Sequence, residues 1–338
     1  MENKIENSNV LASPGDLLEN SWKVLVSNWK LYLKIESIPF IMGFVLFAYV
    51  FGSIWTLTGS VDPMILNVKN SGVLIDILSN KLTMAIILGA MMLFLILTFV
   101  VIAIYANLAL IYAILRRNQS VGLREAFKYV SDNIWTYVIV SFLVGWYVMF
   151  GIMLFILPGI VLAIWFIFSS YVVMDENKKG LSVLLTSRGY MRGRWREVGW
   201  RMFVVSMLTS VIGTGAGLIG DALSATVSPL NLVFLDVVVG FAPTIFSIVT
   251  GLYTTIFMCL LYENVKSVTG EVVIEERTYK KYKVIGWLGL PFGIIVLGIV
   301  AYATISFSMY SVIPHIGGAV QKSNQNSIDY NREYNLPK

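Results

Sequence analysis

The residues best suited to bind a ligand lie in one short stretch, GLSVLLTSRGYMRGRWREVGWR, residues 180–201. Its cations are Arg188, Arg192, Arg194, Arg196 and Arg201, and its tryptophans are Trp195 and Trp200. Arginine binds phosphate through paired N–H donors, and tryptophan favours the headgroup region of a bilayer. The stretch could therefore bind a phosphorylated ligand, grip nucleic acid or lie on a membrane. Without a specific ligand, the same charges could simply mark the cytoplasmic side of a membrane protein.

The groups that enzymes commonly use for catalysis are few and scattered. Cys259 and His315 are the single cysteine and the single histidine, so the sequence predicts no metal site and no disulfide. The acids Asp62, Asp76, Asp221 and Asp236 fall in or beside expected outer loops, where solvated loop acids are the simpler interpretation. No glycine-rich phosphate loop is present. We therefore predict no catalytic residues and no cofactor.

Composition decides the class of protein. The chain has 338 residues, of which 57% are hydrophobic and 13% are charged, whereas a soluble domain has about 25% charged residues. The sequence predicts an all-α, polytopic transmembrane helical bundle. No segment is polar and long enough to form a nucleic-acid-binding domain, so nucleic acid is not an expected partner. The polar N-terminus lacks the basic and apolar regions of a cleavable signal peptide.

We predict seven membrane spans, for which an apolar length of about 20 residues is typical. They cover 38–57, 82–115, 134–155, 159–174, 202–220, 237–261 and 284–313. The third and fourth belong to one uncharged run, and we expect Pro158 and Gly159 to break it into a hairpin. With the N-terminus in the cytoplasm, 20 of the 25 lysines and arginines lie on the cytoplasmic side. The positive-inside rule then predicts a multi-pass plasma-membrane protein with an extracytoplasmic C-terminus.

Three segments before alternate spans share a spacing of four, three and four residues. They are Leu18, Trp22, Leu25 and Trp29; Leu123, Phe127, Val130 and Ile134; and Leu184, Arg188, Met191 and Trp195. This spacing places each set on one helical face. We infer three repeats, each with an interfacial amphipathic helix and two spans. In the first repeat, Ser13 is expected to cap the helix that starts at Pro14.

The repeat divides the chain into five parts. These are a flexible N-terminus, 1–12; a six-span membrane domain, 13–265; a charged cytoplasmic linker, 266–283; a seventh helix, 284–313; and a polar extracytoplasmic tail, 314–338. The stretch with the arginines becomes an interfacial helix over residues 181–196. Arg188 replaces an aromatic residue of the other repeats, so we expect it to point into the bundle towards a carboxylate, a helix C-terminus or a lipid phosphate.

Further residues have expected roles in the membrane. Interfacial anchors are Trp22, Trp29, Trp135, Trp195 and Trp200, because tryptophan gathers at membrane surfaces. Gly213, Gly217 and Gly220 form a small face that predicts close helix packing. The candidate ligands of an anionic lipid or phosphate are Arg188, Arg192, Arg194 and Arg196. Expected partners are membrane lipids, anionic ones among them, and a membrane protein.

Residues 157–200, from LPGIVLAIWF to GRWREVGW, resemble a stretch of the YciC-like integral membrane proteins and of the membrane domain found on some glycerophosphodiester phosphodiesterases. The shared pattern has a Pro-Gly hairpin, an aromatic-rich span, acids at 175–176, a serine at 187, and Gly193, Arg194 and Trp195. The resemblance implies a six-span membrane architecture. It does not imply phosphodiesterase activity, because this chain lacks the separate catalytic domain, and the seventh span departs from the pattern.

Three functions remain open. The first is a non-catalytic, lipid-associated or scaffolding protein of the cell envelope. The second is a transporter or exporter subunit, or an immunity protein against a membrane-active peptide. The third is a membrane enzyme that acts on lipid headgroups. The sequence favours the first, because no ionisable residue lies deep in a span, where transporters commonly place one. Lysine- and asparagine-rich usage suggests a prokaryotic source.

Overall fold

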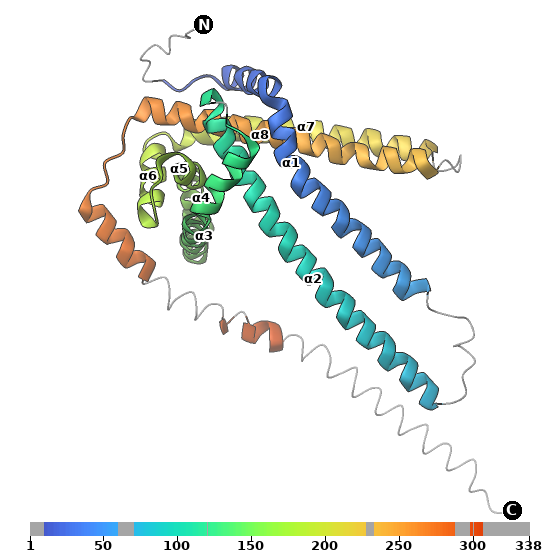
Figure 1. Cartoon of the computed structure of the whole chain (residues 1–338). Helices are drawn as coiled ribbons and strands as arrows, with labels where there is room; N and C mark the ends of the chain where they lie inside the picture. Colours follow the sequence, from blue (N-terminus) through green and yellow to red (C-terminus); the bar gives the residue numbers. More distant parts are fainter. Residues whose placement is uncertain are drawn as a thin grey trace, which may run out of the picture.

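The chain is described by a computed structural model over residues 10–59, 71–119, 121–227, 233–287, 298–299 and 301–306. Its main helices are α1 (Pro14–Gly59), α2 (Ser71–Leu115), α3 (Leu123–Leu154), α4 (Ile156–Trp165), α5 (Ser169–Glu176), α6 (Leu181–Met191), α7 (Trp195–Val227) and α8 (Val233–Thr269). A short 3₁₀ turn, Arg117–Gln119, follows α2, and residues 276–287 form a further helix. These ranges contain no strand, so the all-α expectation is confirmed (Figure 1).

Six described helical segments are long and apolar enough to cross a membrane. They are Pro14–Ile54, Leu82–Leu115, Leu123–Leu154, Ile156–Glu176, Trp195–Leu223 and Pro243–Thr269. Each overlaps one of the first six expected spans, and most extend further into the neighbouring charged segments than the apolar runs did. The seventh expected span, 284–313, lies largely outside the described residues. The multi-pass membrane class is therefore established on six helices.

The first turn of α1 forms as its sequence predicts. The Ser13 hydroxyl accepts a hydrogen bond from the backbone N–H of Asp16 at 3.1 Å and donates one to the Asp16 carboxylate at 2.7 Å. Such a cap satisfies a backbone donor that has no partner in the first helical turn. The helix bends at Asn28, whose φ of −125° and ψ of 18° are not helical. This bend separates the amphipathic segment from the span that follows it.

The helix is interrupted between α3 and α4 at Phe155, not at Pro158 and Gly159 as the sequence predicts. Phe155 has an extended backbone, and α4 begins directly after it at Ile156. Pro158 lies in the first turn of α4, where a proline is tolerated because its missing N–H would have no helical acceptor. Gly159 instead permits the two helices to touch, since an added Cβ would come within 2.9 Å of the Ile152 Cα.

Three helical hairpins diverge from a common base (Figure 1). They are α1 with α2, α3 with α4, and α7 with α8, and the two helices of each pair are in contact. The base comprises residues 11–36, 106–130, 166–201 and 252–287, and it contains α5 and α6. Most buried residues lie there, among them Tyr32, Phe168, Tyr190 and Tyr262. The base is thus the packed core that fixes the position of polar side chains.

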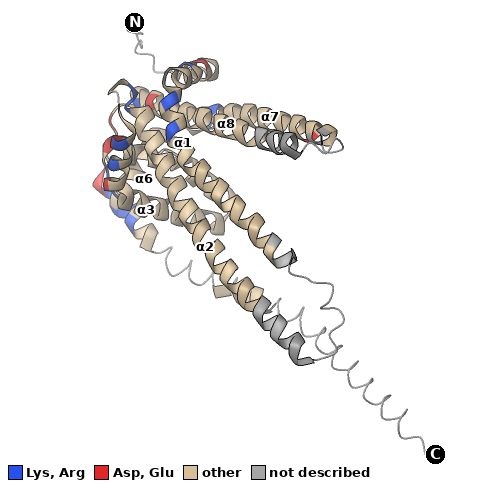
Figure 2. Cartoon of the chain, turned by 45° about the vertical axis from the view of Figure 1, so that its right-hand side comes forward, with Lys and Arg blue, Asp and Glu red and all other residues tan. Residues whose placement is uncertain are grey.

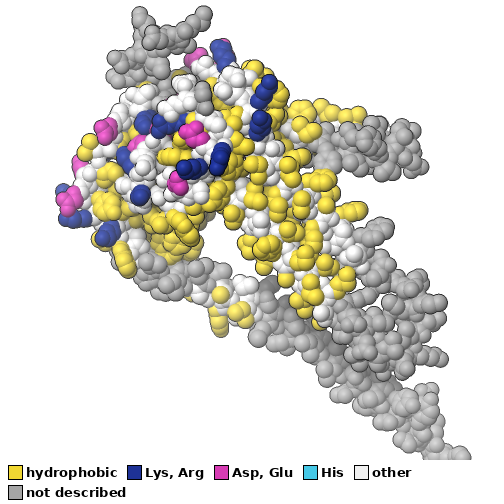
Figure 3. Space-filling view, in the orientation of Figure 1, with side chains coloured by type: hydrophobic (Ala, Val, Ile, Leu, Met, Phe, Trp, Pro, Cys, Tyr) yellow, Lys and Arg dark blue, Asp and Glu magenta, His cyan; other side chains and the backbone are white. Residues whose placement is uncertain are grey.

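The hairpin arms expose large apolar surfaces, whose contact with water is unfavourable. In the most apolar windows of α1 and α2 no residue is buried. Figure 3 shows hydrophobic side chains over these arms and charged side chains over the base. Figure 2 shows the same separation on the ribbon, with most lysines, arginines and acids near the base. Contiguous apolar surface of this extent is typical of contact with lipid.

Candidate functional site at the base

A network of charged and phenolic groups joins α5, α6 and α8. The Lys266 amine lies 2.6 Å from Asp175 Oδ2 and 3.4 Å from Glu176 Oε1, and the Lys178 amine lies 2.8 Å from Glu176 Oε2. The hydroxyls of Tyr190 and Tyr262 both donate to Glu176. The two negative charges of the acids are thus balanced by the two positive charges of the lysines. Its geometry is that of a structural tie between helices.

This network does not resemble a catalytic centre. Burial and the hydrogen bond to the Glu176 carboxylate raise the pKa of Tyr190 above its usual range, so its phenol stays a donor. Both carboxylates accept hydrogen bonds and face lysines, so their oxygens are already engaged within the network. The described residues contain no group of three or more metal-ligating side chains. They therefore offer no visible acid–base pair or metal centre.

Two further arginines fasten the outer segments to the base. The Arg117 guanidinium binds both carboxylate oxygens of Glu263, at 2.7 and 2.9 Å, and this bond is the main cause of its raised pKa. Arg201 donates to the carbonyls of Leu11 and Ala12, and the Ala12 N–H donates to the Asn264 side chain. These arginines already have partners, so they are unsuited to hold a ligand.

Arg188 is different, because it has aromatic neighbours in place of a carboxylate. Its guanidinium carbon lies 4.8 Å from the ring centres of both Trp165 and Tyr282. No carboxylate of the described residues forms an ion pair with it. Arg188 does point into the base, as expected. In place of the expected carboxylate or helix C-terminus, it contacts the rings of Trp165 and Tyr282. Ring contacts use the face of a guanidinium and leave its N–H edge available for an oxyanion.

A cavity of about 300 Å³ adjoins Arg188 between α6 and residues 272–282. Arg188, Arg192 and Lys281 bring three cations to its wall, against the single acid Glu275. Thr278 adds a hydroxyl. Burial raises the pKa of Tyr282 although Arg188 opposes the shift, so this phenol does not neutralise the cations. We name this cavity the cationic pocket; it can accept an anionic group such as a phosphate.

The other two candidate arginines lie elsewhere. Arg196 lines a separate, mostly apolar groove with Trp195 and Trp200. Arg194 lies in a turn, and its buried Nη1 has no hydrogen-bond partner among the described residues. The structure thus brings Arg188 and Arg192 together and does not add Arg194 or Arg196 to their cavity.

The reason is that α6 ends at Met191, so the expected helix over residues 181–196 is wrong. Gly193 has a φ of +79°, a left-handed conformation that suits glycine and interrupts the helix. A turn follows, and α7 begins at Trp195 as part of the next span. Most of α6 is also buried, including Leu184, Ser187 and Met191. It therefore packs inside the base and does not lie along its surface.

The remaining sequence candidates have mixed outcomes. Trp22, Trp29, Trp135, Trp195 and Trp200 are all exposed, as membrane anchors must be. Gly220 approaches Pro243, where an added Cβ would lie 3.0 Å from its Cγ. Gly213 and Gly217, however, have nothing within 4 Å of an added Cβ. Their expected close packing is therefore not seen among the described residues, and Gly213 instead lines a groove between α7 and α8.

Sequence reasoning missed the residues that complete the cationic pocket. The sequence predicts Lys281 and Tyr282 in a linker and Trp165 in a span. The only signal was local: residues 280–283 read Lys-Lys-Tyr-Lys, a basic cluster with one aromatic residue. The basic cluster itself does not indicate that it packs on α6, because this contact depends on the path of the chain after Gly270.

Comparisons of the chain with protein-family models, curated proteins and solved structures give no significant match. The arguments for function therefore come from the cationic pocket and its place in the fold.

Proposed function

We propose that this integral membrane protein is a lipid-associated protein that holds an anionic, phosphate-bearing headgroup in the cationic pocket. The observation that supports it best is the surplus of cations around one cavity. Arg188 stands beside Trp165 and Tyr282 without a carboxylate partner, and Arg192 and Lys281 line the same wall. Each basic side chain near an anionic bilayer surface contributes about 1 kcal/mol.

The location of the pocket suits a lipid better than a soluble anion. Its lining residues belong to the base, from which the apolar arms extend (Figures 1 and 3). The exposed tryptophans Trp195 and Trp200 begin the next span and favour the headgroup region. A lipid held there would have its phosphate at the base and its chains beside the arms.

The proposal includes a cytoplasmic base in a plasma membrane, an orientation that the distribution of lysine and arginine supports. It also includes kinship with the YciC-like membrane proteins, for which the support is the sequence pattern alone. Under this proposal the chain is not an enzyme. Its role is to organise lipid, or a membrane protein partner, in the cell envelope.

Replacing Lys281 by Gln tests the pocket directly. The change removes one cation from the wall, so we expect about fivefold less anionic phospholipid to copurify with the protein. The full chain would be purified in a mild detergent, and bound lipids would be extracted and quantified by mass spectrometry. Zwitterionic lipid should change little.

Lys280 supplies the matched control. It is the neighbouring residue and carries the same charge, but its amine pairs with Glu276 at 2.7 Å on an exposed surface. Lys280→Gln should leave the lipid content as in the wild type. Equal losses in both variants would mean that net charge alone governs retention, and the pocket would be rejected.

A transporter subunit is the second candidate, and one observation favours it. A groove of about 600 Å³ between α7 and α8 is lined by seven hydroxyl groups, from Ser206, Thr209, Ser210, Ser247, Thr250, Thr254 and Thr255. Pro243 also lines it and interrupts the backbone bonding of α8. Several hydroxyls donate to carbonyls of their own helix, for example Thr209 to Val205 at 2.9 Å. A polar path in an apolar arm is expected of a transporter, and solute flux in proteoliposomes would test it.

A further inference from the structure

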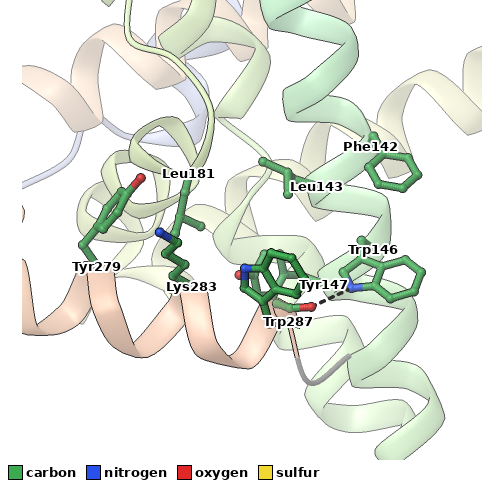
Figure 4. Close-up of a pocket in the computed structure, with 9 residues that line it drawn as sticks. Phe142, Leu143, Trp146, Tyr147, Leu181, Tyr279, Lys283 and Trp287 are labelled. Carbon is green, nitrogen blue, oxygen red and sulfur yellow. Dashed lines mark hydrogen bonds between the residues drawn. The ribbon is translucent and has the colours of Figure 1, made fainter. Parts of the chain in front are cut away.

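A second cavity has a different character from the cationic pocket. It measures about 220 Å³ and lies between α3, the start of α6 and the helix of residues 276–287. Its walls include Phe142, Leu143, Trp146, Tyr147, Leu181 and Trp287. Figure 4 shows these side chains around the space, which we name the apolar slot. The slot and the cationic pocket share no lining residue.

Hydrogen bonds hold the walls of the slot in place. The Trp146 indole N–H donates to the Gly286 carbonyl at 3.4 Å, and the Tyr147 hydroxyl donates to the Tyr282 carbonyl. These bonds fasten residues 282–286 to α3. They also satisfy the two polar atoms that the aromatic walls would otherwise present to the slot. An added Cβ on Gly286 would lie only 2.6 Å from the Tyr147 oxygen, so glycine is needed for this approach.

The mouth of the slot is polar on one side. Tyr279 and Lys283 lie on the side opposite Phe142 and Trp146 (Figure 4). Lys283 is exposed and forms no ion pair with a carboxylate of the described residues. Trp287 and Phe142 are also exposed, at 68% and 66%. A free ammonium beside an open apolar cavity is complementary to an amphiphile with a negative head.

We propose that the apolar slot holds part of an acyl chain of an anionic phospholipid, with the lipid phosphate at Lys283. The slot borders α3, a span whose outer surface is exposed and apolar, so a bilayer lipid can enter from the side. Burying each methylene group of a chain contributes about 0.8 kcal/mol. The inference does not rest on the headgroup proposal, because the slot has its own cation.

The test uses phosphatidylglycerol with a photoactivatable diazirine near the middle of one chain, added to the full-length protein in lipid nanodiscs. After illumination, labelled peptides are located by mass spectrometry. We expect labels on residues 142–147, 181 and 287 above the level on exposed residues of another arm, such as Ile87 of α2. A pattern in which the slot residues carry no more label than Ile87 would overturn the proposal without any variant.

Filling the slot supplies the second arm. Leu143→Trp places a larger ring in the cavity and should lower slot labelling about tenfold, the effect of excluding about two methylene groups. Ile87 lies on the α2 arm, does not line the slot and is 57% exposed, so Ile87→Trp is the control and should not change slot labelling. Unchanged labelling in Leu143→Trp would show that the chain does not enter the slot.

The charge at the mouth gives the third arm. Lys283→Gln should lower slot labelling by phosphatidylglycerol about fivefold and leave labelling by the matching phosphatidylcholine unchanged. Lys281→Gln, which affects the cationic pocket, should leave slot labelling as in the wild type. Labelling lost in Lys281→Gln but kept in Lys283→Gln would assign the lipid to the cationic pocket and reject the slot as its site.

Discussion

Arg188 shows what a single residue contributes at the base. Its charge sits beside two aromatic rings, where a cation–π contact is worth about 0.5–1 kcal/mol at exposed sites and more when water is excluded. The rings can hold the guanidinium without neutralising it. A carboxylate in their place would pair with the guanidinium and remove its attraction for an anion.

Replacing Arg188 by Lys separates charge from shape. Lysine keeps the positive charge but lacks the planar fork that binds phosphate through two N–H groups, and it stacks less well on rings. We expect Arg188→Lys to lower affinity for phosphatidylglycerol about tenfold, as loss of roughly 1.4 kcal/mol implies. Titration of nanodisc-embedded protein, followed by native mass spectrometry, measures this affinity. Arg196→Lys lies outside the pocket and should behave as the wild type.

An affinity of Arg188→Lys equal to that of the wild type would mean that the pocket senses charge alone. An equal loss in Arg196→Lys would mean that the whole basic stretch acts as one surface. Either result would contradict a built phosphate site.

At the scale of elements, the α3–α4 hairpin depends on two glycines. An added Cβ on Gly151 would lie 2.9 Å from the Gly159 Cα, and one on Gly159 would lie 2.7 Å from the Ile152 backbone nitrogen. Both distances are too short for a side chain, so the helices approach because these residues have none. Pro158 and Gly159 indicate the hairpin in the sequence, but neither residue forms its turn. Pro158 lies in the first turn of α4, and Gly159 allows α3 and α4 to approach each other.

Gly159→Ala should therefore destabilise the protein by about 1–3 kcal/mol, the usual cost of overpacking. Gly145 is the control on the same hairpin, because nothing lies within 4 Å of its added Cβ. Gly145→Ala should be neutral or stabilise by about 0.5–1 kcal/mol, since alanine favours the helix. Thermal unfolding in detergent, monitored by intrinsic fluorescence, compares the two. Similar melting temperatures for both variants would refute the close approach.

Some elements could be predicted from the sequence because local chemistry determines them. Ser13, Pro14 and Asp16 define the start of α1, and apolar length defines six spans. The end of α6 does not follow from the sequence pattern, because the helical spacing of Leu184, Met191 and Trp195 continues across Gly193, where the backbone turns. The packing of Lys281 and Tyr282 against α6 was missed for another reason: it is a contact between distant segments, which no local pattern encodes.

The three amphipathic segments also share a pattern of burial. Ser21, Ala126 and Ser187, which occupy matching positions in the expected repeats, are each fully buried. Leu25, Val130 and Met191 match one another and are buried as well. The surrounding geometry differs, however: α1 bends at Asn28, α3 continues straight, and α6 is cut from α7 by a turn. The common burial supports the repeat as a prediction, and alignment of the three backbones would test it further.

At the scale of the whole molecule, charge and apolar surface occupy different ends. The base contains the ion pairs, the cationic pocket and most of the core, while the arms expose apolar side chains. Such a molecule has one natural orientation, with its arms in the bilayer and its base at one surface. Cytoplasmic leaflets carry the anionic lipids that the cationic pocket would need. The orientation of the base therefore decides whether that pocket can meet its proposed ligand.

Site-directed cysteine labelling in intact cells tests this orientation most directly. Cys259 is the single native cysteine, so a Cys259→Ala background allows one reporter at a time. A membrane-impermeant maleimide should label reporters at Lys69 and Lys322 from outside. A reporter at Lys179, which is exposed in the base, should react only after the cells are opened. Labelling of position 179 in intact cells would place the base outside and contradict the account.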